Sequence, residues 1–149
     1  GSSDVYQAAL ALISKKIKAF VLINDITVFN SFESVVRVST NAGIPIFTCD
    51  AERLADGALI VYGFEYYASG MQAARLVDRI VKGESPQFIP FEKYMLVTFG
   101  VNYDVAEVLN IRVPERVSSA ADAWVKDRKL TKPPLVLPSG NKTEKSLLP

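Results

Sequence analysis

The stretch that decides the fold is Ile44-Pro45-Ile46-Phe47-Thr48-Cys49-Asp50, a short apolar run that starts after a glycine and ends in a carboxylate. Three other short apolar runs occur, at residues 19–23, 58–63 and 94–99. Such runs are typical of strands that are buried on both faces of a parallel sheet. Between them, apolar residues recur at helical spacing at residues 8–17, 28–41 and 67–82. The alternation predicts an α/β fold with a mostly parallel sheet and helices on both faces.

The composition excludes several classes of protein. The chain has 149 residues, of which 49% are hydrophobic, so it can form one domain or one lobe of a larger fold. It has no histidine, which excludes a Ser-His-Asp or Cys-His nucleophile system and any zinc site with a histidine ligand. Cys49 is the single cysteine, which excludes a disulfide scaffold. The two glycine-rich nucleotide-binding motifs, G-x-G-x-x-G and G-x-x-x-x-G-K-[ST], are both absent from the sequence. We therefore expect no catalytic residues, no metal site and no cofactor.

Charge is nearly balanced over the whole chain, with 17 basic and 16 acidic residues. A nucleic-acid-binding surface needs a basic patch, so we do not expect nucleic acid among the partners. The end of the chain differs, because residues 126–149 hold six Lys or Arg residues, two acidic residues and four of the eight prolines. The sequence therefore predicts a domain over residues 1–125, with a helix at residues 115–127, and a basic tail over residues 126–149 without a core of its own.

Polar residues follow three of the predicted strands. Asn24 and Asp25 follow the first, Asp50 ends the second, and Glu65 lies just beyond the third. The carboxyl ends of parallel strands meet at one edge of a sheet, where α/β proteins bind their ligands. We therefore predict a rim that carries these four side chains, with Tyr66 beside them as a ring that can stack on a ligand. A rim with two aspartates can hold a cation, a phosphoryl acceptor or an amine.

The same residues also have structural interpretations that the sequence leaves open. Asp25 and Asp50 precede helical segments, and aspartate is a favoured helix cap. Thr27 is a second candidate for the cap of the helix that follows Asp25. Tyr66 can instead cover the sheet edge or pack under its own helix. Cys49 has no histidine to activate it, so we expect its thiol to pack as a small apolar group.

Six segments, in uninterrupted order, resemble a family of bacterial ABC-transporter substrate-binding proteins. This family includes the tryptophan-, tyrosine- and phenylalanine-type binding lipoproteins. Residues 63–70, Gly-Phe-Glu-Tyr-Tyr-Ala-Ser-Gly, are similar to its GFDYYDLG segment. Residues 80–86, Ile-Val-Lys-Gly-Glu-Ser-Pro, are similar to its ILKGEKP segment. Four further matches complete the resemblance, at residues 3–9, 24–28, 41–50 and 109–114.

The resemblance implies a type I periplasmic-binding fold, in which two α/β lobes close on a small ligand. It covers only the second half of that fold. It therefore implies that the chain is a fragment of a solute-binding component, which is not an enzyme and binds a small molecule such as an amino acid in a cleft between lobes. The full-length protein would be a lipoprotein in the periplasm or on the outer face of the cytoplasmic membrane. Its partner would be an ABC permease.

The resemblance also assigns roles to single residues. Asp25 matches a strand-end aspartate that it implies holds the amino group of the ligand, and Asp50 matches a second one. Glu65 stands in place of an aspartate in the loop that faces the cleft, and Asn24 stands where threonine is common. Ile26 replaces the usual asparagine, which removes one polar contact. These departures leave a sugar, a nucleoside or a non-aromatic amino acid open as the ligand.

Two other functions compete with transport. The first is a ligand-sensing domain of a transcription regulator or sensor protein with the same fold. The second is a phospho-acceptor domain, which the late strand disfavours because Thr98-Phe99-Gly100 has no lysine at its end. The resemblance further implies that the helix at residues 67–82 belongs to the first lobe. Its apolar face would then lack its usual sheet, so we expect a homo-oligomer or a swapped dimer through this helix.

Overall fold

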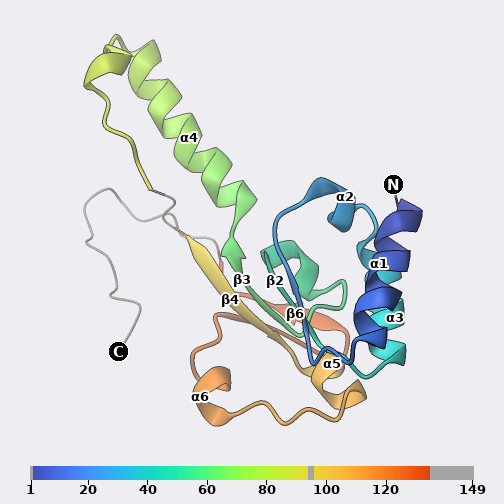
Figure 1. The fold of residues 1–149 in the computed structure, drawn as a ribbon. Helices are drawn as coiled ribbons and strands as arrows, with labels where there is room; N and C mark the ends of the chain where they lie inside the picture. Colours follow the sequence, from blue (N-terminus) through green and yellow to red (C-terminus); the bar gives the residue numbers. More distant parts are fainter. Residues whose placement is uncertain (1, 94–95, 135–149) are drawn as a thin grey trace. The chain divides into compact units, whose positions relative to one another are not determined.

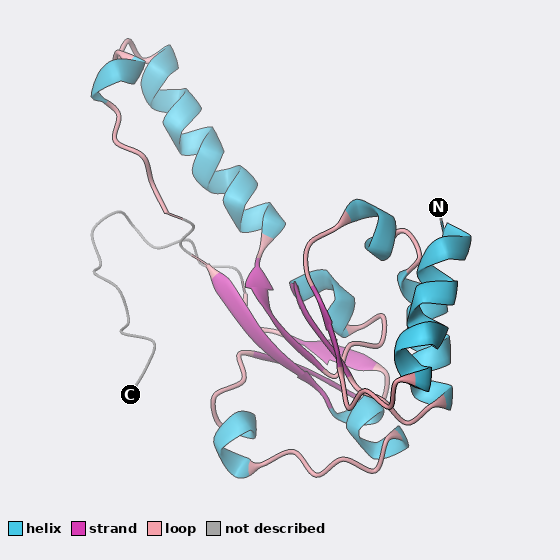
Figure 2. Ribbon diagram, viewed as in Figure 1, coloured by secondary structure: helices cyan, strands magenta, loops and turns pink. Residues whose placement is uncertain are grey.

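The computed structural model describes residues 2–93 and 96–134, and they fall into two compact units. The larger unit, Gly1–Phe64 with Val97–Pro133, holds the sheet. Glu65–Leu96 belong to the smaller unit, which contains one long helix. Figure 1 shows the elements in sequence order and Figure 2 shows them by type.

The sheet unit alternates helices and strands along most of its length. Its helical elements are α1 (Ser2–Ser14), α2 (Ile26–Phe29), α3 (Phe32–Asn41), the 3-10 helix η1 (Ala51–Leu54), α5 (Tyr103–Val108) and α6 (Glu115–Ser118). Its strands are β1 (Phe20–Leu22), β2 (Ile46–Asp50), β3 (Ile60–Phe64), β4 (Val97–Asn102), β5 (Ala123–Lys126) and β6 (Lys129–Thr131). The first three strands confirm the predicted runs. The fourth begins and ends three residues later than predicted.

The six strands form one sheet in the order β1-β2-β3-β4-β5-β6. The pairs β1–β2, β2–β3 and β4–β5 are parallel, whereas β3–β4 and β5–β6 are antiparallel. The predicted fold class is confirmed: a mostly parallel sheet with helices on both faces. Val61 and Val101 lie on opposite faces of the sheet, and both are 0% exposed, so each face is covered where they lie.

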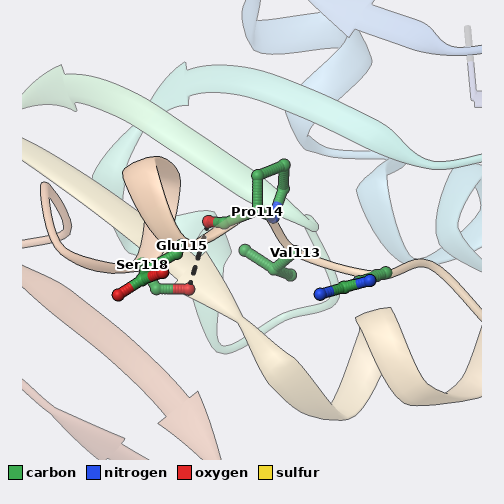
Figure 3. Close-up of a pocket in the computed structure, with 5 residues that line it drawn as sticks. Val113, Pro114, Glu115 and Ser118 are labelled. Atoms are coloured by element: carbon green, nitrogen blue, oxygen red, sulfur yellow. Dashed lines mark hydrogen bonds between the residues drawn. The ribbon is translucent and has the colours of Figure 1, made fainter.

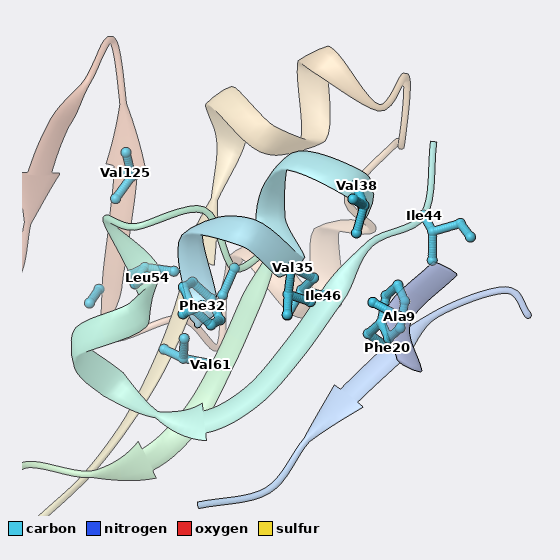
Figure 4. Packing of buried hydrophobic residues seen from close by; sticks show 12 residues of the cluster. Ala9, Phe20, Phe32, Val35, Val38, Ile44, Ile46, Leu54, Val61 and Val125 are labelled. Carbon is cyan, nitrogen blue, oxygen red and sulfur yellow. The ribbon is translucent and has the colours of Figure 1, made fainter. Parts of the chain in front are cut away.

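The main core lies between α1, α3 and one face of the sheet. Ala9 comes from α1, Val35 and Val38 come from α3, and Phe20 and Ile46 come from the strands (Figure 4). Strand residues on this face alternate with residues on the other face, as the pleat requires. The continuous apolar runs of β1 and β2 therefore supply side chains to both faces.

The predicted helix at residues 115–127 is wrong. Helix α6 ends at Ser118, and Ala123–Lys126 form strand β5, in which buried and exposed residues alternate. Trp124 pairs with Val101 of β4, and it is exposed, at 39%. Apolar residues at positions 117, 121, 124 and 125 fit a helical stripe, but the last two belong to a strand, where they lie on opposite faces.

The predicted boundary at residue 125 is also corrected, because the sheet continues past it. Lys129–Thr131 form β6, which pairs with β5 as a hairpin. The turn places Asp127 and Arg128 at φ values of 53° and 59°, as a two-residue hairpin of the primed type requires. Asp104 holds this turn, since its carboxylate accepts the backbone N–H groups of Asp127 at 2.8 Å and Arg128 at 2.7 Å. Most of the expected tail, residues 135–149, lies outside the described residues.

The smaller unit confirms the long predicted helix, α4 (Tyr66–Val81), which is followed by the 3-10 helix η2 (Pro86–Phe88). The helix ends as the sequence predicts, with Gly83 at a φ of 98°. Beyond this glycine, Glu84 accepts two hydrogen bonds from the Arg79 guanidinium, at 2.7 and 2.6 Å. The hydrogen bond from Arg79 holds the pKa of Glu84 below its ordinary value.

Candidate functional site

Two of the predicted rim segments lie at one edge of the sheet. Because β1, β2 and β3 are parallel, their carboxyl ends point the same way, with Leu22 beside Thr48 and Asp50 beside Phe64. Asn24 and Asp25 directly follow this end of β1, and both are exposed. The structure thus brings Asn24, Asp25 and Asp50 to the same edge, as the sequence predicts.

Asp25 is the N-cap of α2. Its Oδ1 atom accepts hydrogen bonds from the backbone N–H groups of Thr27 at 2.9 Å and Val28 at 3.0 Å. Thr27 is therefore inside the helix, and the prediction that it caps the helix is wrong. The predicted single helix at residues 28–41 is in fact two helices, because α2 ends at Phe29 and α3 begins at Phe32. Asp25 thus fixes the first turn after β1 and remains exposed.

Replacement of Asp25 separates its capping role from its charge. Asp25→Ala is expected to lower the free energy of unfolding by about 1 kcal/mol, because two backbone donors lose their acceptor. Asp25→Asn is expected to keep most of this stability, since asparagine caps helices as well as aspartate does. Urea unfolding followed by circular dichroism measures both values. Equal stability of the wild type and Asp25→Ala would contradict the capping role.

Asp50 lies at the same edge but is only 3% exposed. Its Oδ1 accepts the backbone N–H of Glu52 at 3.0 Å, which caps η1, and its Oδ2 accepts Nε of Arg53 at 3.2 Å. Both carboxylate oxygens are therefore engaged within the protein. This geometry makes Asp50 a residue that positions the rim.

Arg53 links the two loops of the rim, and it is not among the site residues predicted from the sequence. Besides Asp50, its guanidinium binds Asp56 at 2.6 Å and lies over the rings of Phe29 and Phe32, 5.8 and 5.7 Å from their centroids. Burial lowers the pKa of Arg53, but the hydrogen bond and charge of Asp50 and the charge of Asp56 raise it further, so the net shift is upward. The spacing Asp50-x-x-Arg53-x-x-Asp56 is the signal that predicts this cluster.

A hollow of about 370 Å³ adjoins this cluster. Phe29, Asn30, Phe32 and Glu33 line it from the α2–α3 side, together with Arg53 and Asp56 from the η1 side. Asn102, the last residue of β4, also holds η1, because its buried side chain donates to the carbonyl of Leu54 at 2.7 Å. The same side chain accepts the N–H of Val105 and caps α5. The rim is therefore held by the core below it.

The other two predicted rim residues begin the smaller unit. Glu65 is the N-cap residue of α4 and is 9% exposed, and its carbonyl accepts the Ser69 N–H at 2.9 Å. Tyr66 is the first residue of α4 and is 45% exposed.

A second hollow has a volume of about 530 Å³, and no rim residue lines it. It is lined by the loop and first turn of α6, with Arg112, Val113, Pro114, Glu115 and Ser118 (Figure 3). Ser118 Oγ donates to the Pro114 carbonyl at 3.4 Å across it. Among the described residues, no group of three or more Cys, Asp or Glu side chains is arranged to hold a metal ion. Within the same residues, no helix has the length and apolar character needed to cross a bilayer.

Comparison with known proteins identifies the family. The family described as ABC transporter substrate binding protein matches residues 2–125. This chain belongs to that family. No curated protein matches the chain.

Three solved structures resemble this substrate-binding-family chain. A conserved domain protein from Vibrio cholerae is 30% identical with a TM-score of 0.74, and the match covers 84% of this chain and 42% of that protein. The ABC domain from Streptococcus pneumonia in complex with L-Trp is 20% identical with a TM-score of 0.73, over 85% of this chain and 42% of that domain. A ligand-free, open substrate-binding protein with adhesive properties from Clostridium difficile is 25% identical with a TM-score of 0.63, over 85% of this chain and 41% of that protein. The chain thus spans less than half the length of each.

Proposed function

We propose that this chain forms part of a solute-binding component of an ABC transporter and supplies one side of the ligand site. The ligand is a small molecule with an ammonium group, such as an amino acid, held in a cleft between two lobes. The family match over residues 2–125 supports the transport role. The structural similarity to a domain that binds L-Trp supports an amino acid as the ligand.

The observation that carries the proposal is the geometry of Asp25. Its carboxylate is exposed at the carboxyl end of a parallel strand, and the hydrogen bonds it receives from the described residues all reach Oδ1. Those two bonds orient the carboxylate, which leaves Oδ2 to accept from a ligand. A charge-assisted hydrogen bond between a carboxylate and an ammonium group is roughly twice as strong as a neutral one.

The remaining rim residues have distinct roles in this proposal. Asn24 is an exposed neighbour of Asp25 and contributes a second polar contact to the ligand. Asp50 positions the rim through Arg53, because both of its oxygens are already bonded. Glu65 and Tyr66 begin α4 in the smaller unit, and their ligand-binding role rests on the resemblance alone.

The rest of the proposal concerns the whole protein. It performs no chemistry, and it delivers its ligand to an ABC permease. It acts in the periplasm or, as a lipoprotein, on the outer face of the cytoplasmic membrane. The family membership supports each of these statements, because substrate-binding components work with a permease outside the cytoplasm.

Thermal unfolding of the chain with a panel of amino acids, nucleosides and sugars tests the proposal. One side of a cleft buries only part of a ligand, so we expect weak binding. A ligand at ten times its dissociation constant then stabilises the native state by about 1.4 kcal/mol. We expect a rise in Tm with one class of amino acid, and no rise for Asp25→Asn, which keeps the helix cap.

The outcomes of this experiment are distinct. A rise in Tm with a sugar or a nucleoside that also occurs in Asp25→Asn would contradict both the ligand class and the role of Asp25. No rise with any member of the panel would contradict ligand binding by this chain.

A further inference from the structure

The hollow of about 370 Å³ beside Arg53 begins one helical turn away from Asp25. Asp25 caps α2, and Phe29 and Asn30, at the other end of this helix, line the hollow. Helix α2 has four residues, so it is about 6 Å long. An extended lysine side chain spans a similar distance. The hollow is therefore within reach of the side chain of an amino acid whose ammonium group is bound to Asp25.

The lining of this hollow is negative overall. Glu33 and Asp56 supply two carboxylates, and Arg53 supplies a single guanidinium. The charge of Arg53 is also shared with a residue outside the lining, because the guanidinium pairs with Asp50 at 3.2 Å as well as with Asp56 at 2.6 Å. A cationic group that enters the hollow is therefore attracted, and an anionic group is repelled.

Glu33 is the carboxylate that such a cationic group can pair with. It lies in the first turn of α3 and is exposed. Among the described residues, no side chain forms an ion pair or a hydrogen bond with its carboxylate. Arg37, one turn further along α3, lies instead over the ring of Tyr6, 5.9 Å from its centroid. Asp56 differs from Glu33, because Arg53 already holds it.

The aromatic wall of the hollow also favours a cation. Phe29 and Phe32 form this wall, and their rings meet edge to face with centroids 6.4 Å apart. The Arg53 guanidinium lies 5.8 and 5.7 Å from these centroids, so both rings already interact with one cationic group. A basic side chain with an aliphatic stem can pack its methylene groups on such a wall while its charged end reaches a carboxylate.

We propose that this hollow binds the side chain of a basic amino acid, such as lysine, and that Glu33 selects its charge. This inference rests on the proposed function, because Asp25 holds the α-ammonium group of the same ligand. Glu33 then determines which amino acid binds, and Asp25 determines whether an amino acid binds at all. A neutral side chain of the same length fills the hollow without pairing with Glu33.

Isothermal titration calorimetry of the chain with lysine, norleucine, phenylalanine and glutamate tests this inference. Norleucine has the carbon skeleton of lysine without the charge at its end. We expect lysine to bind about tenfold more tightly than norleucine, as for one hydrogen bond between charged groups. We expect glutamate to bind more weakly than norleucine, because the lining repels its side chain.

Two variants of the lining and one matched control separate this role from a general effect of charge. Glu33→Gln is expected to bind norleucine as the wild type does and to lose most of the preference for lysine. Asn30→Lys, which adds a positive charge to the lining, is expected to abolish the preference. Glu107→Gln removes the same charge as Glu33→Gln from an exposed glutamate of α5, and it is expected to keep the preference. Circular dichroism shows whether the variants fold.

The outcomes distinguish this inference from the proposed function. Equal binding of lysine and norleucine, or tighter binding of phenylalanine or glutamate than of lysine, would overturn the inference and leave the proposed function standing. A preference for lysine that survives both Glu33→Gln and Asn30→Lys would also overturn it. Binding of none of the four amino acids would contradict the proposed function, and the inference would fail with it.

Discussion

Gly63→Ala is expected to destabilise the sheet unit by about 3 kcal/mol or more. Gly63 lies in β3, where a Cβ atom would overlap the carbonyl oxygen and the carbonyl carbon of Cys49. These are backbone atoms of the neighbouring strand, so no rotamer change can relieve the overlap. The register of β2 and β3 shifts between Thr48 and Asp50, and this irregularity brings the two backbones together.

Gly100→Ala provides the matched control in the adjacent strand. Its Cβ would also be crowded, at 2.6 Å from Leu54 Cδ2 and 2.9 Å from Val61 Cγ2, but these are the ends of side chains. Such atoms can move, so we expect a cost within about 1–3 kcal/mol. Urea unfolding of the two variants gives the comparison. A Gly63→Ala variant as stable as Gly100→Ala would contradict the close approach of β2 and β3.

Leu54→Ala is expected to lower the free energy of unfolding by about 2–5 kcal/mol. Leu54 is 1% exposed and belongs to the core cluster with Phe32, Val35 and Val61. Its loss leaves a cavity beneath η1, whose N-cap is Asp50. The position of the rim therefore depends on this side chain as well as on Arg53.

Leu130→Ala is the control for this prediction, because Leu130 is 41% exposed in β6. We expect a cost of about 0.5 kcal/mol for it, as for most exposed positions. Equilibrium unfolding in urea measures both variants under the same conditions. A Leu54→Ala cost no larger than that of Leu130→Ala would show that η1 does not anchor the rim to the core.

The strands that lead to the rim could be predicted because each is a continuous apolar run with turn residues at both ends. The hairpin at the end of the sheet could not. Its turn depends on positive φ values at Asp127 and Arg128, and these are held by Asp104 from more than twenty residues earlier. Apolar residues near Trp124 also fit helical spacing, so local pattern favours the wrong element. The hydrogen bonds from Asp104 to the turn therefore determine the secondary structure of this region.

The candidate site was predictable in position more than in detail. The parallel order of β1 and β2 brings Asp25 and Asp50 to one edge, which follows from their places at strand ends. What separates their roles is hydrogen bonding. Asp50 is buried, and both of its carboxylate oxygens accept hydrogen bonds, from Glu52 and Arg53. Asp25 uses one oxygen to cap α2 and stays exposed. These contacts depend on how η1 turns back toward α2, which the residue types alone do not show.

We propose that Asp25 presents a carboxylate to the ammonium group of a ligand, and the amide signals of Thr27 and Val28 report on this contact most directly. Both N–H groups bond to Oδ1, so a ligand on Oδ2 changes their surroundings. In ¹⁵N-labelled chain titrated with amino acids to about ten times the dissociation constant, we expect both signals to shift and saturate. In Asp25→Asn we expect neither to move. Signals that stay fixed with every amino acid, or that shift equally in Asp25→Asn, would contradict the claim.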